Sequence, residues 1–505
     1  MPTVSNLSQL TQDAINEFKK ATATAAAQPG DALGKAVTQS TGLVWYDLQA
    51  PAKNLFPVLT PIRNSIPRTS GGGGTATNWK RVTAINSTAL NGFVPEGTRN
   101  GTVTTTVSDK SASYKTLGLE DSLTFEAEVA AKNFEDERAM VAQRLLWATM
   151  IREEIADLGA NLSVALGTPT APTPAVVDGG GTITDGNYDV RVCALTMDGY
   201  LSSSVSGGVA TTTTVTPADG SSSFSYNGGS SAVSNATATG AFTNGNDSAI
   251  KMSTPVVAGA VAYAWFVGAH SGTLYLQAIT TINSYILTAD PVSITQASTA
   301  ITADHSQNAY GYDGFLYHAW TTSSGAYIKN LATGTPGTGT GLTGDGAGGI
   351  SELNDMFLSM WNNYKLSPTR IYANAQEVNN ITNKVLSAGD STKTVARVQY
   401  VQSGDVASGL RVKSVLNRFA MGGSVEVPIE IHPYLPAGTM LAVTEQLPYP
   451  MNNVPNVAEM RLRRDYYQIE WPLRTRKYET GVYFDGVLAH YFPPALGIIT
   501  NIANA

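Results

Sequence analysis

A proline-free stretch of roughly 40 residues constrains the fold of this chain more than any other feature. Within residues 125–166 apolar side chains recur three or four positions apart, which places them on one face of an α-helix. At about 1.5 Å per residue, such a helix would be roughly 60 Å long. The apolar stripe consists of Val141, Leu145, Ala148, Ile151, Ile155, Leu158 and Leu162.

The opposite face of this predicted helix is acidic, with eight carboxylates against four cations. Such a face is usually solvated, and it can also receive a basic arm from a neighbouring chain. The acidic residues are Glu126, Glu128, Glu135, Asp136, Glu137, Glu153, Glu154 and Asp157, and the basic ones are Lys132, Arg138, Arg144 and Arg152.

Charge is scarce along the chain. Only 14% of the 505 residues are charged, against about 25% in a typical soluble protein, which suggests that much of the surface meets protein. The net charge of -7 argues against a nucleic-acid binder held by a general basic field. The single cysteine, Cys193, excludes an intrachain disulfide and a cysteine metal cluster. We expect neither a secretory signal nor a membrane span, because the longest nearly apolar stretch is residues 255–269.

Composition changes abruptly at Gly167. Residues 168–303 hold seven acidic and two basic residues, and they are rich in Ser, Thr and Gly. Short alternating segments separated by turn residues predict a β-sandwich, preceded by a proline-rich hinge. The stretch GTITDGNYDVRVCALTMDGYLSSS resembles immunoglobulin or fibronectin-type modules. Such a module would fold alone as an insertion.

The pattern of the N-terminal region predicts an arm followed by a hairpin. Residues 6–20 predict a short amphipathic helix, and four prolines within residues 41–68 favour extended chain without helix. Residues 69–120 predict two long strands around a Gly- and Pro-containing tip. Because an isolated two-stranded hairpin is marginal, it is either a loose surface loop or an arm that gains stability on a neighbouring subunit.

Residues 304–505 predict an α+β unit, because two helices accompany many strands without regular alternation. Strands are expected within residues 313–331, DGFLYHAWTTSSGAYIKNL, and a flexible Gly-rich loop at residues 334–349. Helices are expected at 350–364 and after the strand in SPTRIYANAQEVNNITNKVL. Further strands are expected in GLRVKSVLNR, GSVEVPIEIHPYL, GTMLAVTE, EMRLRRDYYQIEWPL and LGIITNIA.

Motifs of catalysis are weak. Residues 339–344 match G-x-G-x-x-G but lie inside a longer Gly/Thr tract without the strand that a nucleotide site needs. The five histidines are isolated in sequence, so no catalytic, cofactor or metal residue is assigned. Carboxylates distant in sequence leave an enzyme, for example one acting on carbohydrate, as an open alternative.

One basic cluster stands near the C-terminal end, with Arg461 and Arg463 on one face of a predicted strand. It could touch nucleic acid, but interleaved carboxylates favour ion pairing across a subunit boundary, for instance with the acidic helix. Candidate inter-subunit contacts are Trp79, Lys80, Arg81, Phe93, Arg461, Arg463 and Arg464.

The order of these parts resembles the major capsid protein of tailed bacteriophages, the Hong Kong 97 fold. Local similarities are SPTRIYANAQEV, HPYLPAGTMLAV and the closing segment VYFDGVLAHYFPPALGIITNIA. The resemblance covers residues 1–166 and 304–505. It implies an N-terminal arm (1–68), an extended hairpin loop (69–120), and a spine helix with peripheral domain (121–166). It further implies an inserted immunoglobulin-like sandwich (167–303), peripheral strands with a Gly-rich loop (304–349), an axial domain (350–460) and a C-terminal return (461–505).

The same resemblance implies a non-enzymatic subunit that assembles as hexamers and pentamers into the icosahedral shell of a double-stranded DNA phage in the host cytoplasm. It implies a portal, a separate scaffolding protein and weak inner-surface contact with packaged DNA as partners, and no membrane. Some family members cross-link through a loop lysine, for which Lys80 is the nearest match, but no catalytic carboxylate matches. The alternative is an adhesin or tail-fibre protein with a carbohydrate-binding sandwich. The long helix and the α+β C-terminal half argue against this alternative.

Overall fold

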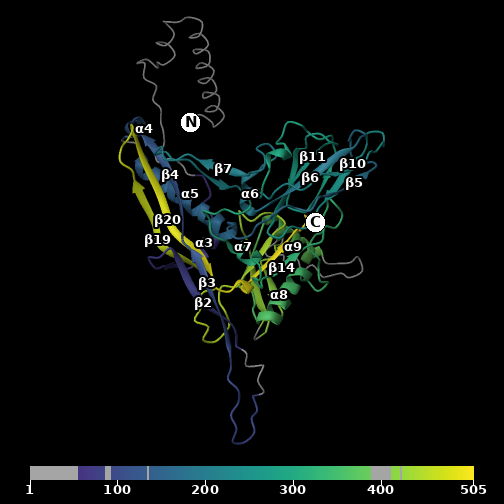
Figure 1. Ribbon diagram of the computed structural model, residues 1–505. Coiled ribbons are helices and arrows are strands. Elements are labelled where there is room, and N and C mark those ends of the chain that lie inside the picture. The colour runs from purple at the N-terminus through teal and green to yellow at the C-terminus, as the bar shows by residue number, and fades with distance from the viewer. Residues whose placement is uncertain (1–54, 86–91, 133–135, 388–410, 421–422, 505) are drawn as a thin grey trace, which may run out of the picture. The chain divides into compact units, whose positions relative to one another are not determined.

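The computed structural model describes residues 55–85, 92–132, 136–387, 411–420 and 423–504 (Figure 1). The expected helix at 6–20 lies outside the described residues. The chain divides into two units, a small one of residues 1–56 and 126–137, and a main unit of residues 57–125 and 138–505. In the small unit, the described residues include most of helix α4 (Phe125–Ala131).

Helices and mostly antiparallel sheets share the main unit, which confirms the α+β fold class. A long antiparallel sheet has the strand order β1-β19-β20-β4, with β1 added parallel to β19. Bulges interrupt the β19–β20 pairing on both sides of Arg464. Its strands are β1 (Arg68–Ser70), β19 (Ala458–Glu470), β20 (Lys477–His490) and β4 (Lys115–Thr124).

Helix α5 (Glu137–Gly159) packs on this sheet through the predicted apolar stripe. Val141 and Leu145 form a cluster with Leu123 of β4 and Val482 of β20. The continuous helix expected over 125–166 is wrong at both ends. Lys132 lies in a turn and Asp136 outside any helix, directly before the first residue of α5, where aspartate is favoured as a cap.

At its other end α5 stops at Gly159, because the following residues bond to a distant loop. Asn161 donates from its amide to the carbonyl oxygen of Ser306 at 2.8 Å, and Asp313 accepts from the backbone of Leu162 and Ser163. Residues 160–167 are therefore held in a non-helical conformation, and the last predicted turn of helix is absent.

A six-stranded mixed sheet has the order β14-β21-β18-β15-β17-β16. Its central strands are buried, and helix α8 (Ser351–Tyr364) packs on them through Leu353, Met356 and Phe357. The expected helices and strands of this region are confirmed, including helix α9 (Ala375–Ser387) directly after β15. The strands are β14 (Tyr327–Asn330), β15 (Arg370–Ala373), β16 (Ser414–Asn417), β17 (Val425–Ile431), β18 (Met440–Val443) and β21 (Leu496–Thr500).

One expected strand of this half is wrong. Phe315–Trp320 form helix α7, which starts after Gly314 and is buried on almost every side. A short run of aromatic and apolar residues fits a buried helix as well as a buried strand, so periodicity alone misassigned it. The 3-10 turn η3 (Pro493–Ala495) leads into β21.

Residues 168–303 form two sheets that share a hydrophobic cluster. The sheets have the orders β13-β10-β5 and β12-β11-β6-β9, and residues such as Ile250 of β10 and Trp265 of β11 meet between them. The strands are β5 (Thr173–Val177), β6 (Tyr188–Leu195), β9 (Thr237–Ala238), β10 (Ala249–Ser253), β11 (Ala262–Ala269), β12 (Tyr275–Thr280) and β13 (Ser284–Leu287). Smaller elements are α6 (Met197–Ser202), the hairpin β7 (Thr212–Val215) with β8 (Phe224–Asn227), and η2 (Ser298–Ala300).

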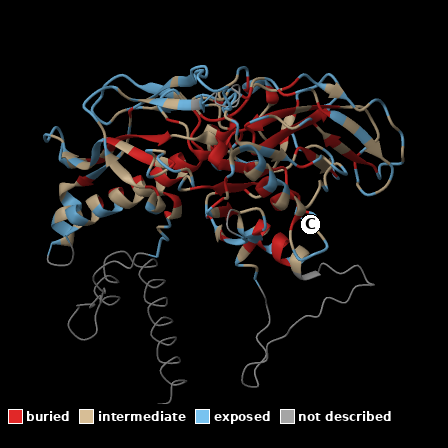
Figure 2. Ribbon diagram, turned by 90° about the horizontal axis from the view of Figure 1, so that it is seen from below, coloured by how far each residue is buried: buried red, intermediate tan, exposed pale blue. Residues whose placement is uncertain are grey.

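The second face of the larger sheet is not free, so the segment is no separate compact unit. Leu195 and Phe266 belong to the same cluster as Leu158 of α5 and Phe315 of α7. Figure 2 shows buried residues in several neighbouring sheets of the main unit. The expectation of a module independent of its surroundings is not met by this packing.

The hairpin of β2 (Ala76–Ile85) and β3 (Thr105–Ser113) forms a two-stranded sheet of its own, as predicted. The second predicted strand is split at Tyr114, after which β4 joins the long sheet. Residues 92–104 extend beyond the paired strands, well clear of the rest of the main unit (Figure 1).

Candidate functional site

Three carboxylates on the last turns of α5 lie in the protein interior. Glu153 and Glu154 are 0% exposed and Asp157 is 1% exposed. The interpretation of the acidic face as solvated is therefore wrong for these three residues. A buried charge is costly unless it is paired, so their partners decide what this cluster does.

Glu154 holds the end of the N-terminal arm. Its two carboxylate oxygens accept from the backbone N–H groups of Ile62 at 2.9 Å and Arg63 at 2.7 Å. These groups belong to the first turn of helix α3 (Pro61–Ser65), where backbone donors have no partner within the helix. Proline at the first helical position needs no such bond, so the expectation that the prolines exclude helix here is wrong.

Glu153 binds two cations of the same arm. Its carboxylate lies 2.8 Å from the Nε of Arg63 and 2.5 Å from a guanidinium nitrogen of Arg68, and it also accepts from the hydroxyl of Tyr466. Burial lowers the pKa of Arg68, but bonds to Asp465 and Glu153 outweigh it and raise the pKa overall. The acidic helix thus receives a basic arm, and that arm comes from its own chain.

His432 completes the shell around Glu154. Its Nε2 lies 2.6 Å from the Glu154 carboxylate, and its Nδ1 accepts from the backbone of Tyr434 at 3.2 Å. Because its Nδ1 accepts, the ring donates a hydrogen bond to Glu154 from Nε2.

Asp157 is left without a cationic partner of its own. The hydroxyl of Tyr312 donates to it at 2.7 Å. Burial, and then repulsion by Glu153, raise the pKa of Asp157 well above its ordinary value. The cluster thus places a carboxyl with a raised pKa next to two carboxylates that bind guanidinium groups and backbone donors. Sequence reasoning missed Arg63, Arg68, Tyr466 and His432, and the only signal for them was the pair of arginines closing the proline-rich segment.

The base of the hairpin contacts its own subunit. Trp79 lies edge-on to Tyr491 with ring centroids 5.4 Å apart, so this candidate inter-subunit residue is partly covered by its own chain. Lys80 pairs with Asp109 across the hairpin at 3.5 Å, with both side chains 78% exposed. The Nε of Arg81 is buried without an acceptor among the described residues. Whether these residues also contact a second copy stays a prediction.

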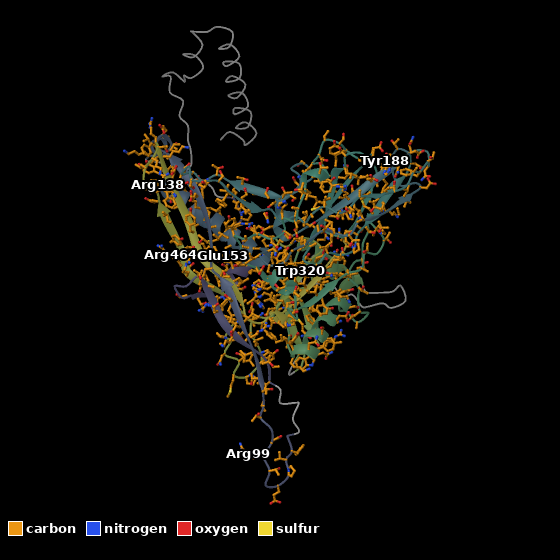
Figure 3. The ribbon with its side chains drawn as sticks, viewed as in Figure 1. Arg99, Arg138, Glu153, Tyr188, Trp320 and Arg464 are labelled. Atoms are coloured by element: carbon orange, nitrogen blue, oxygen red, sulfur yellow. The ribbon has the colours of Figure 1, made fainter. Side chains whose placement is uncertain are left out.

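The outer part of the hairpin is apolar and exposed. Phe93 near the tip is 90% exposed, and Val82 and Ile85 on β2 are 57% and 62% exposed. Figure 3 shows Arg99 at the same tip, far from Glu153 in the interior. Exposed apolar groups gathered on one projecting ribbon mark an interaction surface.

The basic residues of β19 pair within the chain. Arg463 lies 3.3 Å from Asp485 of β20, and Arg461 lies 3.6 Å from Glu459. Arg464 stacks over the ring of Tyr467 with its guanidinium carbon 4.0 Å from the ring centre. Within the chain it is Arg63 and Arg68, and not these three residues, that bind the buried Glu153 of α5. The contact of the three β19 residues with a neighbouring subunit stays a prediction.

Within the described ranges there is no group of three or more His, Cys, Asp or Glu side chains placed to hold a metal ion. In the same part of the chain no helix combines the length and apolarity needed to cross a membrane. Burial raises the pKa of the Cys193 thiol on β6 to about 12, which keeps it in the unreactive protonated form.

No family model and no curated protein matches the sequence. Among solved structures, the chain is similar to a capsid protein of a native GTA particle, with TM-score 0.41, 9% identity, and coverage of 92% of this chain and 97% of that one. It is also similar to the SrpI encapsulin of Synechococcus elongatus PCC 7942, with TM-score 0.39, 8% identity and coverage of 92% and 98%. A third likeness is the capsid of Myoviridae phage XM1, with TM-score 0.38, 10% identity and coverage of 94% and 100%. These scores are too low to carry an argument about this chain.

Proposed function

We propose that this chain is a structural, non-enzymatic subunit of a self-assembling shell with the Hong Kong 97-like fold. The observation that carries the proposal is the exposed apolar hairpin. Phe93, Val82 and Ile85 are more than half exposed on a ribbon that has no third strand in the described structure. A two-stranded ribbon is marginal in water, so this one requires a second surface.

A second copy of the chain is the simplest source of that surface. Burial of one large apolar side chain contributes roughly 1.5–3 kcal/mol, and a closed shell repeats the contact at every subunit. The scarcity of charge, 14% of residues, agrees with extensive contact between subunits. Glu153 and Glu154 hold Arg63, Arg68 and the start of helix α3 in the interior, and we call this group the arm cluster. The arm cluster gives each subunit a fixed base from which the hairpin projects.

We further propose the finer assignment that the sequence resemblance suggests. The chain is then the major capsid protein of a tailed double-stranded DNA phage, arranged as hexamers and pentamers. A portal and a separate scaffolding protein are its partners, packaged DNA touches the inner surface only weakly, and the sheets of residues 168–303 form an immunoglobulin-like insertion.

Electron microscopy and analytical ultracentrifugation of the purified chain test the proposal. We expect closed shells or capsomer sheets from the unaltered chain and dispersed subunits from Phe93→Asp. The matched control is Ile294→Asp, since Ile294 is 89% exposed and lies outside the hairpin. Compact monomers from the unaltered chain at high concentration would refute self-assembly. Equal loss of assembly in both variants would remove the special role of the hairpin.

A further inference from the structure

A cavity of about 320 Å³ lies between the base of the hairpin and the body of the main unit. One wall is formed by β2 and β3, a second by residues 321–324, and a third by the end of β20 with Tyr491. The volume falls near the lower end of the roughly 300–1,000 Å³ typical of small-ligand sites. None of the contacts described for the arm cluster or the hairpin tip fills it.

Two cations line the hairpin wall. The register sets Trp79 opposite Lys110 and Arg81 opposite Ser108, so these four residues share one face of the hairpin. Both Arg81 and Lys110 line the cavity, and neither forms an ion pair with any described residue. Lys80 lies on the opposite face, where Asp109 neutralises it.

The facing loop adds hydroxyl groups. Thr321 and Ser324 donate to backbone carbonyls of α7, whereas the hydroxyls of Thr322 and Ser323 have no bonded partner in the described structure. Ser323 holds a left-handed backbone conformation with φ 60°. For a residue with a side chain this conformation is uncommon, and it is often found at functional sites.

The negative charge at the cavity is already satisfied. Asp313 lines the wall, but its carboxylate accepts from two backbone N–H groups, those of Leu162 at 2.9 Å and Ser163 at 3.0 Å. His318 and His490 lie deeper, and burial lowers the pKa of both, so they are neutral at pH 7. Tyr312 and Tyr491 also line the cavity, and their hydroxyls donate to Asp157 and Glu459. The lining therefore carries two cations, Arg81 and Lys110, against the one carboxylate of Asp313, and the hydroxyls of Thr322 and Ser323 add hydrogen-bond donors.

We propose that this cavity binds a compact oxyanion of the phosphate class, held by Arg81 and Lys110 and by the hydroxyls of Thr322 and Ser323. Arginine presents a planar fork of donors that matches phosphate oxygens, and lysine adds a point charge. The occupant is a free phosphate or a terminal phosphomonoester, since both present the charged oxygens that Arg81 and Lys110 would bind.

The test is calorimetric titration of the purified full-length chain with inorganic phosphate at constant ionic strength. We expect saturable binding of one phosphate per chain. Loss of a charged hydrogen bond should weaken it at least about tenfold in Lys110→Gln and in Arg81→Gln. Lys80→Gln, on the opposite face of the same hairpin, should change the affinity less than about twofold.

A short single-stranded oligonucleotide without terminal phosphate provides the second arm, since it carries phosphodiesters only. We expect it not to displace the bound phosphate, whereas a nucleoside monophosphate should compete. Absence of saturable phosphate binding would overturn the proposal. An equal loss of phosphate affinity in Lys80→Gln would overturn the proposal as well. It would show that the general positive charge of the hairpin, and not a specific site, attracts phosphate. Displacement by the oligonucleotide would contradict a compact site.

Discussion

Asp157→Asn and Glu153→Gln make the same chemical change at two buried carboxyls one turn apart on α5, and we expect opposite results. Glu153 is the ionised partner of Arg63 and Arg68, whose side chains are only 14% and 19% exposed. Its replacement leaves two guanidinium groups without their buried counter-charge. Removing one partner of such a buried pair costs about 3–5 kcal/mol of the free energy of unfolding.

Asp157 behaves differently because its pKa in the folded chain is raised well above its ordinary value. A group of this kind stabilises the fold fully below its unfolded pKa of about 3.9, and it loses that contribution as the pH rises through the folded pKa. The asparagine side chain of the variant stays neutral in both the folded and the unfolded state. Near pH 4 the free energies of unfolding of the variant and the unaltered chain should agree within about 1 kcal/mol, because the amide still accepts from Tyr312.

As the pH rises above about 4, the free energy of unfolding of the unaltered chain should fall relative to that of Asp157→Asn. The difference should grow by about 1.4 kcal/mol per pH unit until the pH reaches the folded pKa of Asp157. Urea unfolding of both proteins, followed by circular dichroism from pH 4 to 8, measures this difference. A gap between them that does not change with pH would refute the assignment of a proton to Asp157. Asp465→Asn is the control, because the Asp465 side chain is 55% exposed and its pairing with Arg68 should contribute no more than about 1 kcal/mol.

Three further outcomes follow from the packing. Leu145→Asp places a charge in the cluster between α5 and the long sheet and should abolish the soluble chain, as judged by its yield after expression; normal recovery would show that the stripe does not face the core. Trp79→Ala should lower the melting temperature of the dispersed chain, because the contact between Trp79 and Tyr491 lies within one chain. Phe93→Ala should leave that melting temperature unchanged and weaken only assembly. Equal melting temperatures of the two variants would contradict the contact between Trp79 and Tyr491. Replacing residues 168–303 by a short linker should expose the larger sheet's partners in the core and prevent folding, and a cooperative melt of the deleted chain would show that the segment is independent after all.

Local pattern predicted much of the fold. Val141, Leu145 and Leu158 of the predicted stripe are buried, whereas Ala148, Ile151, Ile155 and Leu162 are only partly buried. Helix α8 (Ser351–Tyr364) ends where expected, directly before Lys365. Strand β20, with 14 residues, was not predicted, because Gly481, Asp485 and Gly486 interrupt its alternation.

Less of the candidate site than of the fold could be predicted from the sequence. The hairpin and its exposed tip follow from local composition. The burial of Glu153 depends on Arg68, 85 residues away, and on Tyr466, 313 residues away. Charge pattern on one helix cannot reveal partners at such separations, since their proximity is a property of the assembled sheet. The partners of Arg461 and Arg463 are nearer in sequence, since Glu459 lies two positions from Arg461 and Asp485 lies 22 positions from Arg463.

The position of β21 has a consequence for how the chain folds during synthesis. This strand lies between β14 and β18. Gly497 pairs with Tyr327 of β14, 170 positions earlier, and Leu496 pairs with Val443 of β18, 53 positions earlier. Until residues 496–500 have left the ribosome, β14 and β18 have no common neighbour, and the buried edges of both remain open. Closure over so large a sequence separation is slow. The nascent chain therefore presents two unpaired strand edges during translation, and a chaperone that shields strand edges should raise the yield of folded chain.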